Sequence, residues 1–274
     1  MVAAGRGDAQ IVRRNFQSSD NVRLSFLEAG VENAVEKKTT IAFITGWSMP
    51  ASLWQRQLAE LSPSYHALAL DPRGQGESQV PTFGYTAERR ATDINEFLTP
   101  FSKVLLVGWS LGAIEALQYV SMFGADRLAG LVLVDSSVGE EPAPGAGAEG
   151  AFIKELRKDR GKALTGFVHA IFKTKRSDAD LDDLVHGAKR MALDDSIALL
   201  SYPFPRTHWR QITRGFTKPL LYVVTPQFEA QAHNLEMNRP GTQIEVFRSA
   251  GHALFVDEPQ RFNGLIEKFA KDLP

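Results

Sequence analysis

A serine between two glycines is the group in this chain whose setting is best suited to chemistry. Residues 108–112 read Gly-Trp-Ser-Leu-Gly, follow the apolar run 104–107 and precede a helix-like segment that begins at Ala113. Where a strand turns sharply into a helix in this way, the serine hydroxyl is pushed out of the sheet and can attack a substrate. Side chains at positions 108 and 112 would clash with the neighbouring chain in such a crowded turn. The pattern predicts that Ser110 is a nucleophile.

A serine hydroxyl is a poor nucleophile at its free pKa, so it needs a base, usually a histidine that a carboxylate orients. His252 lies in the loop between the last expected strand and the C-terminal helix, and Gly251 lets the backbone bring the imidazole toward Ser110. The chain order serine, acid, histidine is the order expected of a nucleophile on this type of turn. We therefore expect His252 to be the base.

Two carboxylates are candidates for the acid. Asp135 directly follows the apolar run 131–134, at the carboxyl edge of the expected sheet, where ligand chemistry collects in open α/β sheets. Glu229 lies in a loop after the next apolar run, 220–224. Because a carboxylate at a strand end is held more rigidly than one in a loop, we favour Asp135 and keep Glu229 as the alternative acid.

Acyl chemistry at a serine also needs two hydrogen-bond donors for the negative charge that develops on the carbonyl oxygen. The backbone N–H of Leu111, directly after the nucleophile, is one candidate, and the N–H of Trp47, in the loop after the apolar run 41–44, is the other. These donors would form an oxyanion hole. Trp47, Met49 and Trp109 are also the side chains that we expect to contact substrate.

The order of apolar and amphipathic segments indicates the fold that must position these groups. Apolar runs, which are typical of a parallel sheet covered on both faces, lie at residues 41–44, 66–70, 104–107, 131–134 and 220–224, and a sixth strand is expected at residues 243–247. Helix-like segments alternate with them at residues 52–61, 86–98, 113–123 and 259–271. This alternation predicts an α/β protein with a mostly parallel central sheet and helices on both faces. An antiparallel edge hairpin is expected near residues 11–17 and 22–29.

Residues 136–215 interrupt this alternation. A loop rich in proline and glycine at residues 141–147 breaks regular structure, and helical patterns follow it at residues 151–159, 162–172, 178–190 and 194–201. We expect a helical cap, or lid, over residues 137–215, inserted into a core formed by residues 1–136 and 216–274. The cap is expected to lie where the Ser110 site opens.

Composition and charge exclude several classes of function. The chain has 274 residues, of which 43% are hydrophobic and 23% charged, as in an ordinary globular protein. With a formal net charge of −1 and scattered basic residues, neither nucleic acid nor a membrane surface is expected as a partner. No apolar run is long enough to cross a bilayer, residues 1–10 lack a signal-peptide core, and cysteine is absent, so we expect a cytoplasmic protein. We expect neither a metal nor a cofactor, and the sequence indicates no oligomeric state.

A further loop, residues 71–78, reads Asp-Pro-Arg-Gly-Gln-Gly-Glu-Ser. We expect Asp71 and Arg73 to pin it by charge-assisted hydrogen bonds and assign it no chemistry. With this loop, the chain resembles the α/β-hydrolase superfamily, in its lid-bearing esterase/haloperoxidase-like branch. The other residues that carry the resemblance are Thr45-Gly46-Trp47, Trp54, the 108–112 turn, Gly251-His252, Glu258-Pro259 and Phe262.

The resemblance implies the α/β-hydrolase fold and a serine hydrolase, a carboxylesterase that cleaves a small ester or similar acyl substrate through an acyl-enzyme. The 108–112 turn also resembles that of carboxylesterases acting on acyl-carrier methyl esters. Two positions depart from the family pattern. Thr45 stands where the family usually has histidine, and Phe228 falls near the place of a common aspartate. The second departure favours Asp135, because some relatives carry their acid after the preceding strand.

Other functions fit the same residues. Cofactor-free perhydrolysis, with apparent haloperoxidase activity, and hydrolysis of a carbon–carbon bond would both use Ser110, His252 and the acid. A ligand receptor on a hydrolase fold is the non-enzymatic alternative. Haloalkane dehalogenation is disfavoured, because it needs a carboxylate nucleophile and position 110 is serine.

Overall fold

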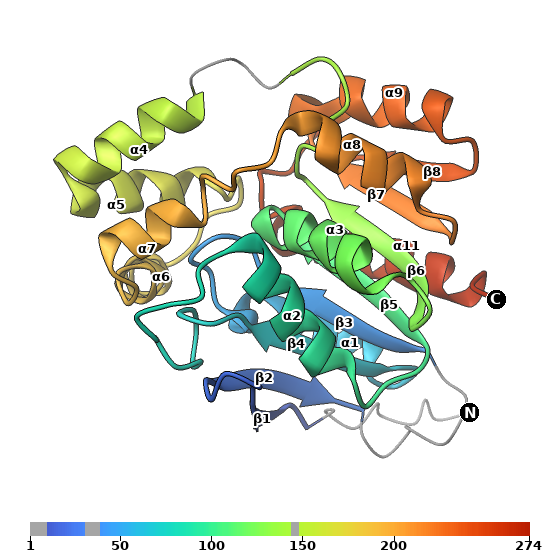
Figure 1. Cartoon of the computed structure of the whole chain (residues 1–274), viewed down its shortest axis with the longest axis horizontal. Helices are drawn as coiled ribbons and strands as arrows, with labels where there is room; N and C mark the ends of the chain where they lie inside the picture. The colour runs from blue at the N-terminus through green and yellow to red at the C-terminus, as the bar shows by residue number, and fades with distance from the viewer. Residues whose placement is uncertain (1–9, 31–38, 144–147) are drawn as a thin grey trace.

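A central sheet organises the molecule in this computed structural model, which describes residues 10–30, 39–143 and 148–274. Within these ranges eight strands form one sheet in the order β1-β2-β4-β3-β5-β6-β7-β8 (Figure 1). The strands are β1 (Val12–Gln17), β2 (Arg23–Ala29), β3 (Thr40–Ile44), β4 (His66–Asp71), β5 (Val104–Trp109), β6 (Leu128–Val134), β7 (Leu220–Val224) and β8 (Thr242–Val246). β2 is antiparallel to β1 and β4, and the remaining neighbours are parallel. The predicted edge hairpin and mostly parallel sheet are confirmed.

Helices cover both faces of the sheet (Figure 1). One face packs against α1 (Gln55–Leu61), the short α10 (Leu254–Asp257) and α11 (Pro259–Lys271), and the other against α2 (Ala87–Leu98), α3 (Leu111–Phe123) and α9 (Glu229–Asn238). Alternate residues of one strand enter opposite clusters: Ile41 and Phe43 belong to the first, Ala42 and Ile44 to the second. Burial on both faces explains why these strands are continuously apolar. The predicted fold class is confirmed.

Between β6 and β7 the described residues form five helices. They are α4 (Ala148–Lys158), α5 (Arg160–Ala170), α6 (Asp178–Ala188), α7 (Leu193–Ala198) and α8 (Arg206–Gly215). The first four pack on one another and lie together at the left of Figure 1, whereas α8 packs against α3 of the sheet layer. Part of the predicted 141–147 loop, residues 144–147, lies outside the described residues, as do residues 1–9 of the N-terminal segment.

Besides the four-residue α10, two longer helices, α8 and α9, were not predicted from the sequence. α8 begins directly after Pro205, and this proline and the one two residues before it are strong loop signals. α9 presents only three buried side chains to the sheet, so its sequence lacks a clear apolar stripe. As a consequence Glu229, expected in a loop, is the first residue of α9.

The loops at the carboxyl ends of the parallel strands converge on one edge of the sheet. Ser110 follows β5, Asp135 follows β6, Trp47 lies in the loop after β3, and His252 lies in the loop after β8. Parallel strands bring the ends of these four segments together although they are far apart in the chain.

Candidate active site

Ser110 lies between β5 and α3 in a strained backbone conformation. Its φ of 55° and ψ of −121° lie outside the regions that residues with a side chain normally adopt. A Cβ on Gly108 would overlap the carbonyl of Gly112, and a Cβ on Gly112 would overlap the carbonyl of Ile44. Glycine at these two positions therefore allows the tight turn, and the Ser110 side chain is left half-buried at the edge of the sheet.

Three of the predicted residues are joined by hydrogen bonds. His252 Nε2 lies 2.9 Å from Ser110 Oγ, and His252 Nδ1 lies 2.7 Å from Asp135 Oδ2. Because an ionised carboxylate can only accept a hydrogen bond, Nδ1 carries the imidazole proton and Nε2 presents its lone pair to the serine hydroxyl. In this arrangement an imidazole can take the proton of the serine.

Asp135 is held between the ends of two strands. Its φ of 44° is positive, and its backbone N–H donates to the carbonyl of Val223 over 2.8 Å. Its Oδ1 accepts the N–H of Thr225 over 2.6 Å, so each carboxylate oxygen has a partner. The side chain is only 1% exposed. The carboxylate is therefore fixed in the direction of the imidazole.

The alternative acid, Glu229, has a different partner. Its Oε2 accepts a hydrogen bond from Arg248 over 2.9 Å, and its Oε1 accepts a second one from the same guanidinium. These hydrogen bonds hold the pKa of Glu229 below its usual value. Of the two predicted carboxylates, Asp135 is the one that the fold brings to His252.

The loop that carries Trp47 lies against the serine. A Cβ added to Gly46 would be 3.0 Å from the Cβ of Ser110, so glycine permits this close approach. In the described part of the chain, the backbone N–H groups of Trp47 and Leu111 donate to no protein acceptor. Both predicted oxyanion donors thus belong to segments that adjoin Ser110 and have a free hydrogen to offer a substrate.

The three side chains expected to contact substrate are largely enclosed by protein. Trp109 is 1% exposed, and its indole N–H donates to the backbone carbonyl of His252 over 2.8 Å. Met49 is fully buried, and the indole N–H of Trp47 donates to the carbonyl of Ser196 in α7 over 2.7 Å. Trp109 therefore supports the backbone of His252 through its hydrogen bond. Substrate contact by these three side chains stays a prediction.

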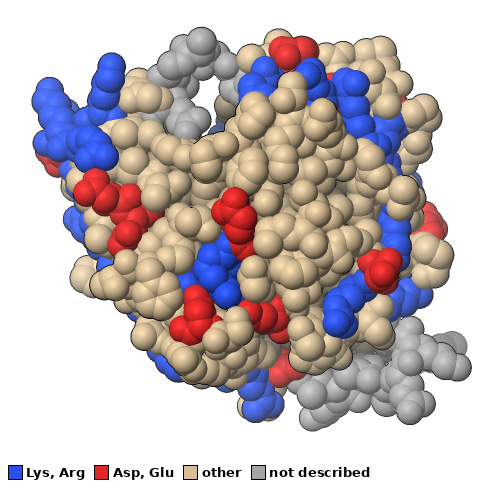
Figure 2. All heavy atoms as spheres, in the orientation of Figure 1, with Lys and Arg blue, Asp and Glu red and all other residues tan. Residues whose placement is uncertain are grey.

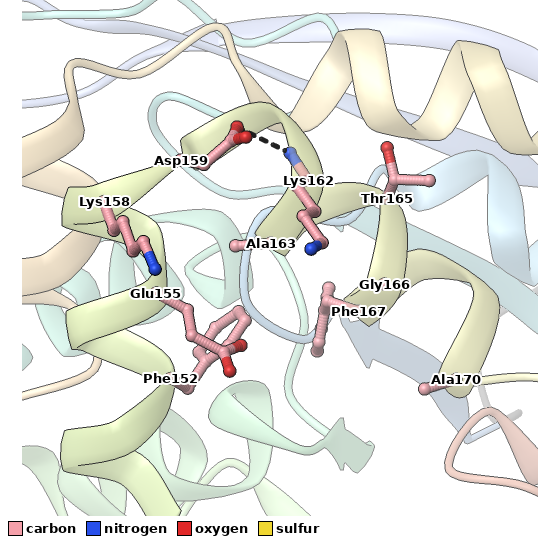
Figure 3. A pocket seen from close by; sticks show the side chains of 10 residues that line it. All are labelled: Phe152, Glu155, Lys158, Asp159, Lys162, Ala163, Thr165, Gly166, Phe167 and Ala170. Atoms are coloured by element: carbon pink, nitrogen blue, oxygen red, sulfur yellow. Dashed lines mark hydrogen bonds between the residues drawn. The ribbon is translucent and has the colours of Figure 1, made fainter.

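A pocket of about 880 Å³ opens between α4 and α5. Figure 3 shows the rings of Phe152 and Phe167 projecting from the two helices into this pocket. Their centroids are 5.6 Å apart, and each ring meets Trp47 edge to face, at 5.6 Å and 5.3 Å. The apolar wall of the pocket is therefore in contact with the loop that lies against Ser110.

Asp257 attaches the histidine loop to the segment after α5. Its carboxylate accepts the N–H of Gly251 over 2.7 Å and the N–H groups of Lys173 and Thr174 over 2.9 Å each. Burial alone would raise the pKa of Asp257, but a hydrogen bond from the Thr174 hydroxyl, together with those three N–H groups, holds it below its usual value. Asp257 was not predicted from the sequence, because a lone aspartate at the end of a short helix carries no recognisable signal for its partners.

Gln75 is the second residue that the sequence analysis missed. The loop at residues 71–78 is pinned as expected: Asp71 accepts the N–H of Glu77, and Arg73 donates to both oxygens of Asp93. The same loop also reaches the Trp47 segment, because Gln75 Nε2 donates to the carbonyls of Gly46 and Met49 over 2.9 Å each. No sequence pattern links a glutamine to carbonyls about thirty residues away.

The described residues show neither a metal-binding cluster nor a membrane-spanning helix. No group of three or more His, Asp or Glu side chains in these ranges could hold a metal ion. Likewise, none of the helices built from them is long and apolar enough to span a membrane.

The sequence matches a known family over most of its length. Residues 41–265 match the model of the alpha/beta hydrolase family. Non-heme chloroperoxidase CPO-A1 of Kitasatospora aureofaciens is 36% identical over 99 residues, which are 35% of this chain and 36% of that protein. This chain therefore matches only about a third of the chloroperoxidase. The pimeloyl-acyl-carrier-protein methyl ester esterase of Yersinia pseudotuberculosis is 26% identical over 253 residues, 85% of this chain and 93% of that protein.

Solved structures share the fold. A bromoperoxidase from Bacillus anthracis superposes with a TM-score of 0.82 at 20% identity, covering 94% of this chain and 100% of that one. An esterase from Exiguobacterium antarcticum superposes with a TM-score of 0.77 at 22% identity, covering 94% of this chain and 99% of the esterase. At these identities the likeness concerns the architecture of the chain.

Proposed function

The chain belongs to the alpha/beta hydrolase family, and on this basis we propose that it is a serine hydrolase that cleaves a carboxylic ester through an acyl-enzyme. One observation carries the proposal: Ser110 Oγ, His252 and Asp135 form a continuous chain of hydrogen bonds, with distances of 2.9 Å and 2.7 Å. The likeness to a methyl ester esterase over 85% of the chain supports an ester as substrate.

In the proposed acylation, His252 Nε2 takes the hydroxyl proton as Ser110 Oγ attacks the ester carbonyl carbon. The carbonyl oxygen becomes an oxyanion, and the N–H groups of Trp47 and Leu111 donate to it. Asp135 remains ionised and stabilises the imidazolium through Nδ1. His252 then gives the proton to the leaving alkoxide oxygen, so the alcohol departs and an ester to Ser110 remains.

Deacylation repeats these steps with water. His252 Nε2 takes one proton from a water molecule, whose oxygen attacks the acyl carbon and forms a second tetrahedral intermediate in the same oxyanion hole. When this intermediate collapses, the bond to Ser110 Oγ breaks and the imidazolium returns its proton to the serine. The carboxylic acid leaves, and the free enzyme is restored.

We assign the helices between β6 and β7 the role of a cap. On this proposal residues 137–215 form the cap and residues 1–136 and 216–274 the catalytic core. The contacts of Trp47 with Ser196, Phe152 and Phe167 support this role, because they connect three cap helices to the oxyanion loop. An apolar group of the substrate would lie in the pocket of Figure 3, against the two phenylalanine rings.

Perhydrolysis is a second candidate, favoured by the 36% identity with a chloroperoxidase over 99 residues. Hydrogen peroxide would replace water in deacylation, lose one proton to His252 and attack the acyl carbon. The product would be a peracid, which oxidises bromide in solution, and Ser110 would be regenerated as in hydrolysis. Bromination that depends on acetate, peroxide and Ser110 would support this activity, and its absence in an esterase-active preparation would exclude it.

Labelling with a fluorophosphonate tests the main proposal. The wild-type protein is expected to be labelled at Ser110 and to hydrolyse short p-nitrophenyl esters, and Ser110→Ala is expected to lose both properties. Ser137→Ala is the matched control, because this nearby hydroxyl is hydrogen-bonded to Gln231 over 3.1 Å and away from the imidazole. A folded wild-type protein that is neither labelled nor active would overturn the proposal and leave a ligand receptor as the alternative.

A further inference from the structure

We infer that Gln75 is a positioning residue that aims the Trp47 N–H of the oxyanion hole. The inference rests on the hydrolysis proposed above, because that N–H matters to catalysis only if an oxyanion forms there. The Gln75 side chain is 1% exposed, and both ends of its amide have partners. Nε2 donates to the carbonyls of Gly46 and Met49, 2.9 Å from each, and Oε1 accepts from Arg90 over 3.2 Å.

The carbonyl of Gly46 and the N–H of Trp47 belong to one peptide group. A peptide group is planar and almost always trans, so its C=O and N–H point in opposite directions within one plane. When Gln75 fixes the direction of the Gly46 carbonyl, it also fixes the direction of the Trp47 N–H. Its second hydrogen bond, to Met49, holds the far end of the same short loop and limits rotation of that plane.

The orientation of the Gln75 amide is itself determined by its surroundings. A guanidinium has donors only, so Arg90 can face only the oxygen of the amide, and the NH₂ group must then face the loop carbonyls. Arg90 is held in turn by Glu115, with Nε 2.8 Å from Oε1 and Nη2 3.1 Å from Oε2. Tyr202 completes the chain, because its hydroxyl donates to Glu115 Oε1 over 2.9 Å.

These contacts indicate a role for the buried ion pair between Arg90 and Glu115. Arg90 and Glu115 are each 1% exposed, and removing two charges from water costs about as much free energy as their attraction returns. A net gain in stability therefore does not explain the pair well. As a fixed support, the pair instead gives Gln75 one orientation, and Gln75 in turn holds the oxyanion loop.

Gln75→Met tests the inference, because methionine has a similar length and volume but no amide. We expect kcat for a short ester to fall about 10- to 100-fold, with KM changed less than about threefold, since a misplaced donor weakens binding of the transition state. Hydrogen exchange of the amides in residues 45–49 is expected to become faster. Gln75→Glu, which places a carboxylate against two carbonyls, should act in the same direction.

Ser78→Ala is the matched control. Ser78 belongs to the same loop, is buried, accepts the N–H of Ser25 over 2.8 Å and donates to the carbonyl of Asp71, so neither hydrogen bond of its hydroxyl is made with residues 45–49. It should lose stability while keeping kcat and exchange at residues 45–49 near the wild-type values. If Gln75→Met retains kcat within about twofold in a protein that is labelled at Ser110, Gln75 does not position the donor.

Different results would overturn the hydrolase proposal and the positioning role of Gln75. A wild-type protein without labelling or turnover would overturn the hydrolase proposal, and the claim about catalysis would fall with it. The structural part of the inference would then be decided by hydrogen exchange, which needs no activity. Unchanged exchange at residues 45–49 in both Gln75 variants would overturn that part as well.

Discussion

The proposed nucleophile and acid both lie on strained backbone that is hydrogen-bonded to the next strand of the sheet. Ser110 and Asp135 both have a positive φ, 55° and 44°, directly after neighbouring strands. Such conformations cost about 1–3 kcal/mol each and persist only where the surroundings enforce them. The N–H of Ser110 donates to the carbonyl of Val134, and the N–H of Asp135 donates to the carbonyl of Val223. Each strained residue is therefore anchored to the next strand of the sheet.

Asp135→Asn should lower kcat/KM for a p-nitrophenyl ester by about 10³- to 10⁴-fold. Because Oδ1 accepts the N–H of Thr225, the asparagine oxygen would keep that contact and its NH₂ would face His252. The imidazole would then carry its proton on Nε2 and could not accept one from Ser110. Glu229→Gln is expected to stay within about threefold of wild type. Steady-state kinetics of both variants check the assignment, and the reverse pattern would make Glu229 the acid.

A functional residue can be predicted from the sequence where its neighbours in the chain form a recognisable pattern. Ser110 is recognisable from two glycines and its position between a strand and a helix, and His252 from its place last in the chain order. The choice of Asp135 depended on how rigidly a strand end holds a side chain, and the Arg248 partner of Glu229 could not be foreseen. Gln75 and Asp257 act through contacts with segments that only the folded chain brings near them.

Asp257 connects the histidine loop to the segment that follows α5, which belongs to the proposed cap. Asp257 joins that segment to Gly251, and the N–H of Ala253 donates to the carbonyl of Ile171 over 2.8 Å. A Cβ on Gly251 would lie 2.8 Å from the same Ile171 carbonyl, so the two segments are closely packed. The position of the His252 loop is therefore coupled to that of the segment after α5.

Asp257→Asn should lower both stability and activity. The side-chain amide would turn its NH₂ group toward backbone N–H donors, leaving at least one of them unsatisfied at a cost of about 1–3 kcal/mol. We expect kcat to fall about 10-fold as the His252 loop loosens. Chemical denaturation and ester kinetics measure the two effects, with Asp183→Asn on the exposed side of α6 as control. Equal activity of the two variants would contradict the coupling of loop and cap.

The turn between β1 and β2 is attached to the rest of the protein by an ion pair that should respond to acid. Partial burial would raise the pKa of Asp20, but hydrogen bonds from Arg73 and Ser18 lower it from its usual 3.8 to about 2. Because the folded-state pKa is the lower one, the stabilisation is complete above about pH 4 and is lost as the pH falls through 2. With solvent at the site, it should amount to about 1–2 kcal/mol.

Unfolding free energies of wild type and Asp20→Asn between pH 6 and pH 2 measure this contribution. The difference between the two proteins should be constant near neutral pH and should shrink toward zero at the acid end. A difference that grows as the pH falls would show that the Asp20 carboxylate is not stabilised by Arg73.

The strands of this chain are easier to predict than two of its helices, for a physical reason. A strand buried on both faces must be apolar throughout, and this is visible in the sequence without knowledge of its neighbours. A helix at the rim of the sheet, such as α9, needs only a few buried side chains, and α8 follows two prolines that indicate a loop. Their existence depends on packing against the sheet layer and α3, which the sequence alone does not reveal.

The molecule as a whole carries a formal net charge of only −1, which suits a small neutral substrate. Figure 2 shows basic side chains near the upper margins and along the right side of this face, a group of acidic and basic side chains left of and below its centre, and a largely uncharged area to the right of the centre. With a formal net charge of −1, the protein creates no strong long-range field to attract a polyanion. Selection of the substrate would then depend on the fit of its apolar part at the cap.

Phe152→Ala tests whether the proposed cap selects the substrate while the core carries out the reaction. Removing one aromatic wall of the pocket should lower kcat/KM for aromatic and long-chain esters by about 10-fold, which is the usual effect of lost apolar contact with a substrate. Acetate esters, too small to reach the ring, should change less than about threefold. Phe83→Ala is the control, because this phenylalanine is 52% exposed and lies in the loop before α2, outside the pocket lining.

The ratio of kcat/KM for long esters to kcat/KM for short esters shows whether Phe152 contacts the substrate or supports Trp47. Phe152 also meets Trp47 edge to face, so its loss could disturb the oxyanion loop as well as the pocket. A disturbed oxyanion loop would slow every ester by the same factor, since all of them form the same oxyanion. A lost substrate contact would slow only the esters that reach it. A uniform loss across the series would therefore contradict the selecting role of the cap and leave Phe152 as a support for Trp47.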